Sequence, residues 1–245
     1  MASRHDHDHG HEHSHMVHDH RDVQGGAARA AVFGISDGLV SNVALILGVA
    51  AASTEASPVV IAGVSGLLAG AASMAAGEYV SMKAQNELIE RELRIERESL
   101  AQNPQGELRE LQTIYAQRGL DQDMARELAE AVHEDPEVAL EVHAREELGV
   151  DPDDIGDPIG AAVSSFVAFA LGAVLPLIPW FLMDGTAATV VSVTVGLIAA
   201  AVVGIVLARF TERSPLRTAA RQVSWAAGAC LITFGIGTLL GTTVA

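Results

Sequence analysis

The apolar residues of this 245-residue chain are gathered into five long stretches, and this pattern limits the possible folds more than any other feature. The stretches cover residues 28–52, 58–82, 159–183, 187–209 and 220–243. A helix that spans a bilayer needs about 20 mostly apolar residues, and each stretch is long enough. A soluble protein would have too little polar sequence to cover five such helices. We therefore expect an all-α polytopic membrane protein with five transmembrane helices.

The charged residues are placed as unevenly as the apolar ones. The formal net charge is −16, and residues 84–157 hold 14 Glu and 7 Asp against 7 Arg, a net charge of −14. We accordingly divide the chain into a His-rich tail (1–24), two spans (25–83), an acidic insert (84–157) and three further spans (158–245). Nucleic acid is not an expected partner, because its phosphates repel such an insert.

The insert has the pattern of a small helical domain. Neither Gly nor Pro occurs between Glu78 and Leu100, so the second span is predicted to leave the membrane as one continuous helix that ends before Pro104. Shorter helices are predicted over 107–118, 121–133 and 136–148. Asp135 and Pro136 fit the N-cap and the first residue of the last of these.

Positively charged residues predict the orientation in the membrane. Arg and Lys precede the first span, follow the second and lie between the fourth and fifth, whereas the loops at 53–57 and 184–186 have none. We expect the N-terminus, the insert and the loop at 209–221 in the cytoplasm, and the C-terminus outside. Neither a signal peptide nor an organelle signal is recognised, so a bacterial plasma membrane is the expected location.

Three residues of the first two spans predict a path for a cation. Asp37 lies about ten residues, or roughly 15 Å, into the first span, and Met74 and Glu78 lie roughly 12 and 6 Å from the cytoplasmic end of the second. A carboxylate costs several kcal/mol in hydrocarbon and is a functional candidate there. Oxygen with thioether sulfur suits a transition metal better than Mg²⁺ or Ca²⁺. A carboxylate that takes up a proton as the metal leaves would couple the two ions.

Each of these residues also has a plainer explanation. Asp37 could form structural hydrogen bonds with Ser41 or Asn42, Glu78 could extend to the membrane interface, and Met74 could simply pack. A further pattern in the second span is the row of small residues Ala62, Gly66 and Gly70, which lets another helix approach closely. This row would either pack the bundle or form the seam of a dimer, and we favour the dimer.

The insert holds a second candidate metal site. Helical spacing places acidic residues and one His on shared faces of three helices. Such a cluster suits Fe²⁺, Mn²⁺ or Zn²⁺. The alternative is a solvated acidic face with arginine partners such as Arg91, Arg94 and Arg109. The candidate ligands are Glu92, Glu96, Glu107, Glu110, His143, Glu146 and Glu147.

The first 22 residues hold eight of the ten histidines, alternating with Asp, Glu and Ser. We expect this low-complexity tail to be disordered without metal and to bind Zn²⁺, Ni²⁺, Cu²⁺ or Fe²⁺ loosely through neutral imidazoles. The irregular alternation differs from the pure His run of an affinity tag. The auxiliary ligands of the tail are His5, His7, His9, His11, His13 and His15.

Two passages resemble the vacuolar iron transporter family: DGLVSN at 37–42 and SMAAGEYVSMKAQNEL at 73–88. The order of two spans, a Glu-rich helical insert and three spans is similar as well, from about residue 25 to the end. The resemblance implies a homodimer with a metal path between the protomers, and H⁺-coupled antiport of Fe²⁺ out of the cytosol. It implies that Asp37 and Met74 form the membrane metal site. Glu78 stands where bacterial relatives carry Glu, so a bacterial-type member is expected.

In the insert, the resemblance implies metal-binding roles for Glu96, Glu107, Glu110 and Glu147. Two positions depart from the family's pattern. Ser99 stands where some members have a liganding Glu, and His143 stands where those members have Met. The ligand number and the metal preference of this insert are therefore open.

The leading hypothesis is a transporter that exports Fe²⁺, Mn²⁺ or both from the cytosol by proton antiport, with Zn²⁺ as a further candidate. The metal is then substrate and bound ion, and no prosthetic group is expected. The alternative is a membrane-anchored metal buffer or sensor without flux, which would have no need of Asp37. An enzyme is not expected, because a ferritin-like ferroxidase needs two Glu-x-x-His pairs and the insert has one, Glu130 with His133.

Overall fold

The computed structural model describes residues 26–53, 55–152 and 155–244, and this part of the chain is helical apart from short turns, with no strand. Five helical segments are long and apolar enough to cross a bilayer. Four of them lie in α1 (Gly26–Ala52), α2 (Ala56–Gln102), α8 (Gly185–Phe210) and α9 (Pro215–Val244). The predicted fold class, an all-α integral membrane protein with five spans, is confirmed.

The remaining span is not one regular helix. It consists of α6 (Pro158–Val174), a 3-10 turn η2 (Leu175–Leu177) and the short α7 (Ile178–Leu182). Pro176 and Pro179 have no N–H to donate to the preceding turn, which accounts for the change of helix type. The span predicted over 159–183 is present as the candidate span Pro158–Leu182, with this change of helix type inside it.

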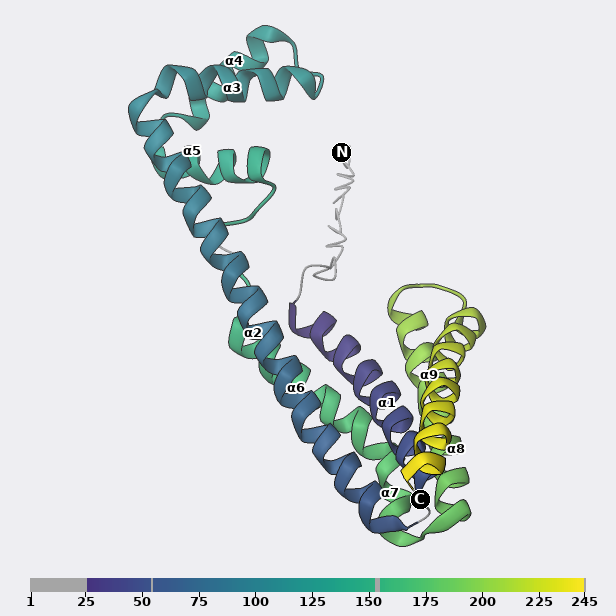
Figure 1. Ribbon diagram of the computed structural model, residues 1–245. Coiled ribbons are helices and arrows are strands. Elements are labelled where there is room, and N and C mark those ends of the chain that lie inside the picture. The colour runs from purple at the N-terminus through teal and green to yellow at the C-terminus, as the bar shows by residue number, and fades with distance from the viewer. Residues whose placement is uncertain (1–25, 54, 153–154, 245) are drawn as a thin grey trace, which may run out of the picture.

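Helix α2 joins the apolar bundle to the insert (Figure 1). Its 47 residues are roughly 70 Å long, more than twice the roughly 30 Å hydrocarbon core of a bilayer. It ends at Gln102, and the Asn103 side chain accepts a hydrogen bond from the N–H of Gly106 at the start of the next helix. The predicted continuation of the second span as one uninterrupted helix that ends before Pro104 is confirmed.

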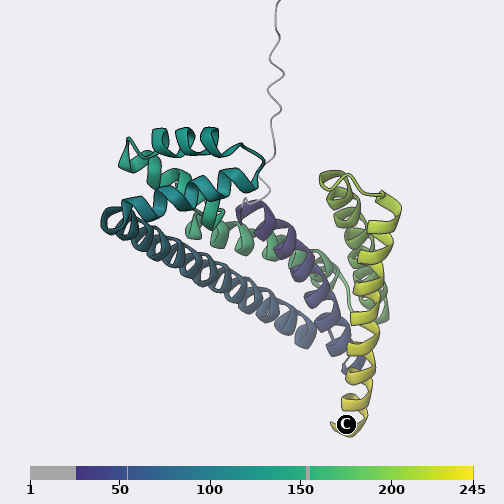
Figure 2. The same ribbon diagram turned by 90° about the horizontal axis from the view of Figure 1, so that it is seen from above.

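The insert contains α3 (Pro104–Gln117), α4 (Gln122–Val132), α5 (Pro136–His143) and a π-helical turn η1 (Ala144–Leu148) (Figure 2). Asp121 and Asp135 cap α4 and α5 by accepting hydrogen bonds from backbone N–H groups. Leu111 and Tyr115 of α3 pack against Ala125 and Ala129 of α4 in a small apolar core. The three predicted helices are present, and the widened π turn was not predicted.

Helix α6 lies against both α1 and α2, and α1 also contacts α9. The backbones of α1 and α6 approach closely because glycines face the contact. A Cβ atom at Gly38 would collide with the carbonyl oxygen of Phe169, and one at Gly172 would collide with the carbonyl oxygen of Ile35. This close crossing fixes where Asp37, the neighbour of Gly38, lies relative to α6.

The turns and chain segments that connect the spans fall into two groups, one at each end of the bundle (Figure 1). The start of α1, the insert and the turn between α8 and α9 lie toward one end. The turn between α1 and α2, helix α7 and the end of α9 lie toward the other. Five spans that alternate in direction produce this grouping.

Candidate metal sites

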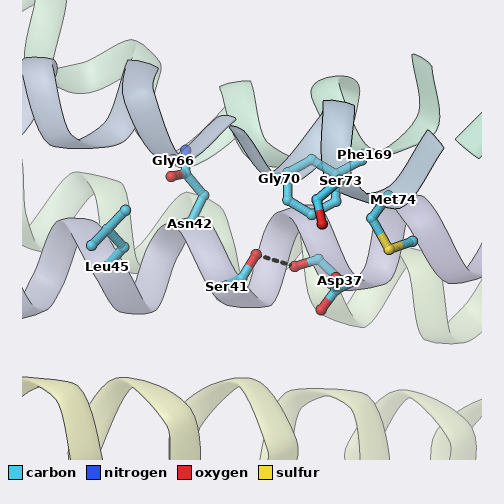
Figure 3. A pocket seen from close by; sticks show the side chains of 9 residues that line it. All are labelled: Asp37, Ser41, Asn42, Leu45, Gly66, Gly70, Ser73, Met74 and Phe169. Carbon is cyan, nitrogen blue, oxygen red and sulfur yellow. Dashed lines mark hydrogen bonds between the residues drawn. The ribbon is translucent and has the colours of Figure 1, made fainter. Parts of the chain in front are cut away.

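The first candidate site is a pocket of about 280 Å³ between α1 and α2 (Figure 3). Asp37 and Met74 both line it, as the sequence predicted for a common site. Asp37 and Met74 are half-buried, whereas Ser41 and Ser73, which also line the pocket, are exposed. The pocket therefore joins a carboxylate and a thioether in a site that reaches the surface of the chain.

Phe169 of α6 forms one wall of this pocket and is only 4% exposed. Its ring lies against Gly70, where a Cβ atom would collide with the ring carbons. A Cβ atom at Gly66 would meet the side chains of Leu45 and Asn42. Gly66 and Gly70 thus allow helices of the same chain to pack closely. Of the two roles considered for the row of small residues, this is packing of the bundle and not the seam of a dimer. Sequence reasoning missed Phe169, because nothing distinguishes it within an apolar run.

Ser41 and Asn42 are hydrogen-bonded to backbone atoms and not to the Asp37 carboxylate. The Ser41 hydroxyl donates to the carbonyl oxygen of Asp37 at 2.5 Å, and the Asn42 Nδ2 donates to the carbonyl oxygen of Ala173 at 2.6 Å. The alternative explanation for Asp37 was a structural hydrogen bond from Ser41 or Asn42 to its carboxylate. Neither side chain makes that hydrogen bond.

Glu78 does not line the pocket. Its Oε2 lies 3.3 Å from an Nη of Arg29, near the start of α1, and the side chains are 14% and 71% exposed. Glu78 is one turn beyond Met74 on α2, so it lies between the pocket and the insert. The convergence expected for all three residues holds for Asp37 and Met74, while Glu78 stands apart with an arginine partner.

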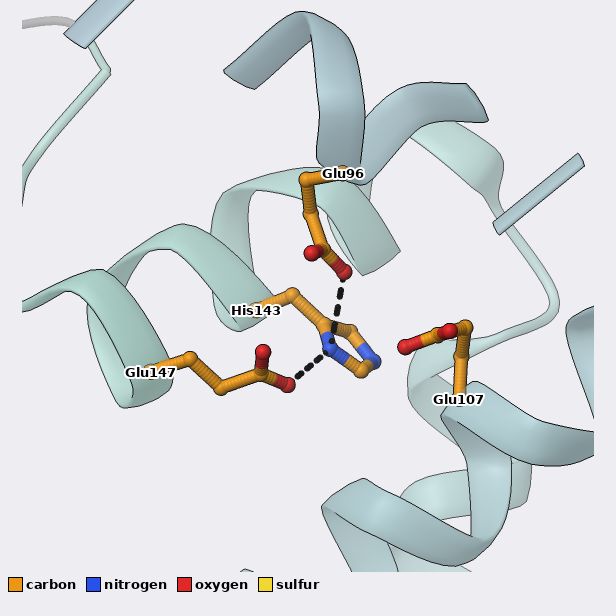
Figure 4. A group of neighbouring side chains, drawn as sticks. All are labelled: Glu96, Glu107, His143 and Glu147. Atoms are coloured by element: carbon orange, nitrogen blue, oxygen red, sulfur yellow. Dashed lines mark hydrogen bonds and ion pairs between the residues drawn. The ribbon is translucent and has the colours of Figure 1, made fainter. Parts of the chain in front are cut away.

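The second candidate site lies in the insert, where Glu96, Glu107, His143 and Glu147 meet (Figure 4). Each residue offers one ligand atom, and these atoms all lie within 4.8 Å of one another. They come from the end of α2, the first turn of α3, the end of α5 and the π turn. A single ion can therefore contact side chains from all four of these segments.

His143 is the centre of the cluster and is 0% exposed. Its Nδ1 lies 2.5 Å from Oε1 of Glu147 and 3.2 Å from Oε1 of Glu96. An Nδ1–H that donates to the Glu147 carboxylate leaves Nε2 with its lone pair, and Nε2 is buried without a hydrogen-bond partner. Nε2 faces the Glu107 carboxylate in Figure 4. A histidine that donates one ring N–H to a carboxylate while the other nitrogen binds a metal is a common arrangement.

Two carboxyl groups of this cluster, those of Glu96 and Glu147, have pKa values above the usual range. Burial raises the pKa of Glu147 to about 7, and the neighbouring charges of Glu110 and Glu107 add to the effect. Burial also raises the pKa of Glu96, as does the charge of Glu147, while His143 acts in the opposite direction. Excess negative charge in a half-buried centre is the condition that a divalent cation relieves. The donor set of three carboxylates and one imidazole fits a borderline divalent metal.

The other predicted ligands of the insert lie around this group. Glu110 is close enough for its charge to act on Glu96 and Glu147. Glu92 is paired with Arg91, and Glu146 is paired with Arg118 at the end of α3. Glu92 and Glu146 thus match the alternative of acidic groups with arginine partners. The tail residues His5, His7, His9, His11, His13 and His15 lie outside the described residues.

His133 is a neighbour that sequence reasoning did not include in the site. Its ring is edge-on to that of His143, with the ring centroids 5.3 Å apart, and its Nδ1 is 2.8 Å from the carbonyl oxygen of Ala129. The only signal in the sequence was its place in the single Glu-x-x-His pair. His133 packs against the imidazole of the cluster and holds it from the side of α4.

Comparisons with known proteins point to one family. The sequence model of the VIT family matches residues 28–238. Vacuolar iron transporter 1 of Arabidopsis thaliana is 32% identical over 196 residues, which cover 80% of this chain and 78% of the relative. The vacuolar iron transporter of Acanthamoeba castellanii is 36% identical over 226 residues, covering 91% and 83%, and vacuolar iron transporter 1 of Oryza sativa subsp. japonica is 30% identical over 229 residues, covering 92% and 91%.

These relatives carry the names of transporters and not of enzymes, in agreement with the expectation that the protein is not an enzyme. The family match covers the first four apolar segments, most of the fifth, and the acidic insert between the second and third. The chain belongs to the VIT family.

Proposed function

We propose that this protein exports a divalent transition metal, Fe²⁺ or Mn²⁺, from the cytosol in exchange for protons. The observation that carries the proposal is the pocket in which Asp37 and Met74 meet among apolar membrane helices. A carboxylate is expensive to keep in hydrocarbon unless a cation uses it. The names of the relatives, vacuolar iron transporters, support metal-ion transport and iron as the substrate.

The insert is proposed to collect the metal before it reaches the membrane. Arg and Lys are concentrated at the end of the bundle from which the insert extends. The positive-inside rule therefore favours a cytoplasmic insert and an external C-terminus. Metal held at Glu96, Glu107, His143 and Glu147 would be released toward Glu78 and then enter the pocket. A bacterial plasma membrane is the proposed location, where export relieves metal excess.

Proton exchange follows from the chemistry of the carboxylates. A carboxylate that holds a metal ion must be ionised, and it takes up a proton most readily when the cation leaves. Protons that enter from outside would displace the metal from the Asp37 carboxylate. The protonated carboxyl group would then release its proton on the cytoplasmic side. The gradient of protons would thus drive the metal outward.

A homodimer is proposed because the pocket opens onto the surface of the single chain. Ser41 and Ser73 are exposed on the side where the pocket reaches the surface. Hydroxyl and carboxylate groups in contact with lipid are unfavourable. A second copy of the chain across α1 and α2 would cover them and complete the path.

The test is transport by purified protein in liposomes that contain a metal-sensitive dye, with a pH-sensitive dye in parallel. Wild type is expected to carry Fe²⁺ and Mn²⁺ and to move protons the other way. Asp37→Asn should lose both signals, while Asp184→Asn, an exposed carboxylate in the turn before α8, should keep them. Metal that binds to wild-type liposomes without a dye signal would reject transport in favour of the membrane-anchored buffer or sensor.

A further inference from the structure

The Asn42 side chain is an unusual wall of the membrane pocket, because it is polar, 2% exposed and only half satisfied. Its Nδ2 donates to the carbonyl oxygen of Ala173 at 2.6 Å. Its Oδ1 is buried and accepts no hydrogen bond from any described residue. A buried oxygen without a donor is costly, so such an atom calls for a ligand or a functional reason.

The orientation of this amide is fixed by its surroundings. Ala173 is the residue before the last of α6, where the helix gives way to the 3-10 turn, and carbonyls in a last helical turn lack regular partners. Turning the amide over would place Oδ1 against that carbonyl oxygen and would lose the hydrogen bond. The hydrogen bond to Ala173 therefore holds Oδ1 on the other side, toward α2.

Gly66 of α2 provides the space in front of this oxygen. A Cβ atom at Gly66 would lie 3.1 Å from Oδ1, so any larger residue would close the approach. Asn42, Gly66 and Leu45 form the end of the pocket away from Met74 in Figure 3. Asn42 is five residues beyond Asp37 on α1, roughly 7.5 Å further along the helix axis and farther from the insert.

We infer that the Asn42 Oδ1 is an uncharged oxygen ligand for the transported cation, placed one step beyond Asp37 and Met74. This inference rests on the proposed transport. A carbonyl-type oxygen binds a divalent ion more weakly than a carboxylate, and an ion path needs sites from which the ion can leave. Amide oxygen also suits harder ions such as Mn²⁺ better than softer ones such as Zn²⁺. Asn42 would therefore take part in the choice of metal.

The test compares Fe²⁺ uptake into liposomes by wild type and Asn42→Leu while Mn²⁺ or Zn²⁺ competes. The measured quantity is the ratio of two concentrations, that of Mn²⁺ and that of Zn²⁺, at which Fe²⁺ uptake falls by half. Loss of the oxygen in Asn42→Leu should raise this ratio by about fivefold or more. The matched control is Ser192→Ala, which removes another buried hydrogen bond between helices, from the Ser192 hydroxyl to the carbonyl oxygen of Pro176, outside the pocket. This control should leave the ratio unchanged.

Asn42→Asp gives a second measurement, because it keeps an oxygen at the site and adds charge. Mn²⁺ should then compete at a lower concentration, and the maximal rate should fall because the ion leaves more slowly. A ratio of Mn²⁺ to Zn²⁺ inhibition that stays within twofold of wild type in both variants would overturn the inference and leave Asn42 a structural residue. Absence of uptake by wild type itself would instead contradict the proposed function.

Discussion

The Nδ1 atom of His143 lies 2.5 Å from Oε1 of Glu147, four residues further along the chain. The contact joins the last residue of α5 to the π turn that follows it. π-helical turns occur often at functional sites, because the extra residue per turn re-aims side chains. Here the turn directs Glu147 to the imidazole while its neighbour Glu146 pairs with Arg118.

Metal binding by the insert should depend steeply on pH. Burial and neighbouring charges raise the pKa of Glu147 to about 7, so below pH 7 the carboxyl group holds a proton that an incoming metal must displace. The affinity for Mn²⁺ is expected to increase by about tenfold per pH unit from pH 5.5 to 7 and to level off above pH 8. Calorimetric titration of the full-length protein in detergent measures this.

The control for the pH profile is Glu147→Gln, which has no proton to lose. This variant should bind Mn²⁺ more weakly at pH 8 and should show a flatter profile between pH 6 and 7.5. An affinity that does not change between pH 5.5 and 8 in wild type would mean that ionised Glu147 is not part of the binding centre.

Glu96 and Glu92 should differ in their importance although they are one turn apart on α2. Glu96 belongs to the buried group around His143, whereas Glu92 is paired with the exposed Arg91. Glu96→Gln should weaken Mn²⁺ binding by about tenfold or more, as loss of a ligand or of its close partner does. Glu92→Gln is expected to bind within about twofold of wild type, and equal losses in the two variants would contradict this assignment.

This pair also illustrates what the sequence can predict. Hydropathy and the absence of helix breakers were enough for the spans and for the length of α2. The start predicted at Asp121 and the N-cap predicted at Asp135 agree with the starts of α4 and α5. Spacing also placed Glu92 and Glu96 on one face. It could not tell which of them is buried, because that depends on helix α5, whose residues follow about 40 positions later.

The membrane pocket shows the same limit. Asp37 and Met74 were identified because a carboxylate and a thioether stand out in apolar helices. Phe169 and the role of Gly38 could not be found, because both depend on the contact between α1 and α6, which are far apart in sequence. The break at Leu175 follows from prolines that a hydropathy pattern does not weigh.

The ion pair between Arg29 and Glu78 should contribute little by itself. Arg29 is 71% exposed, and exposed pairs stabilise a protein by at most about 1 kcal/mol. Arg29→Ala is therefore expected to transport metal at nearly the wild-type rate. Glu78→Gln should lower the rate on the order of tenfold, because it removes a negative charge that attracts the cation toward the pocket. Uptake assays in liposomes compare the two, and equal rates would assign Glu78 to the ion pair alone.

Gly38 and Gly77 offer a direct test of the close crossing that positions Asp37. A methyl group at Gly38 would collide with the Phe169 carbonyl oxygen, whereas one at Gly77 would meet nothing within 4 Å. Gly38→Ala should force α1 and α6 apart at a cost of about 1–3 kcal/mol, seen as a lower unfolding temperature in detergent. Gly77→Ala should be neutral or stabilising by up to about 1 kcal/mol, because alanine favours the helix. Because Phe169 forms a wall beside Asp37, Gly38→Ala should also reduce metal uptake per folded molecule; unchanged stability and uptake would show that the crossing does not position the carboxylate.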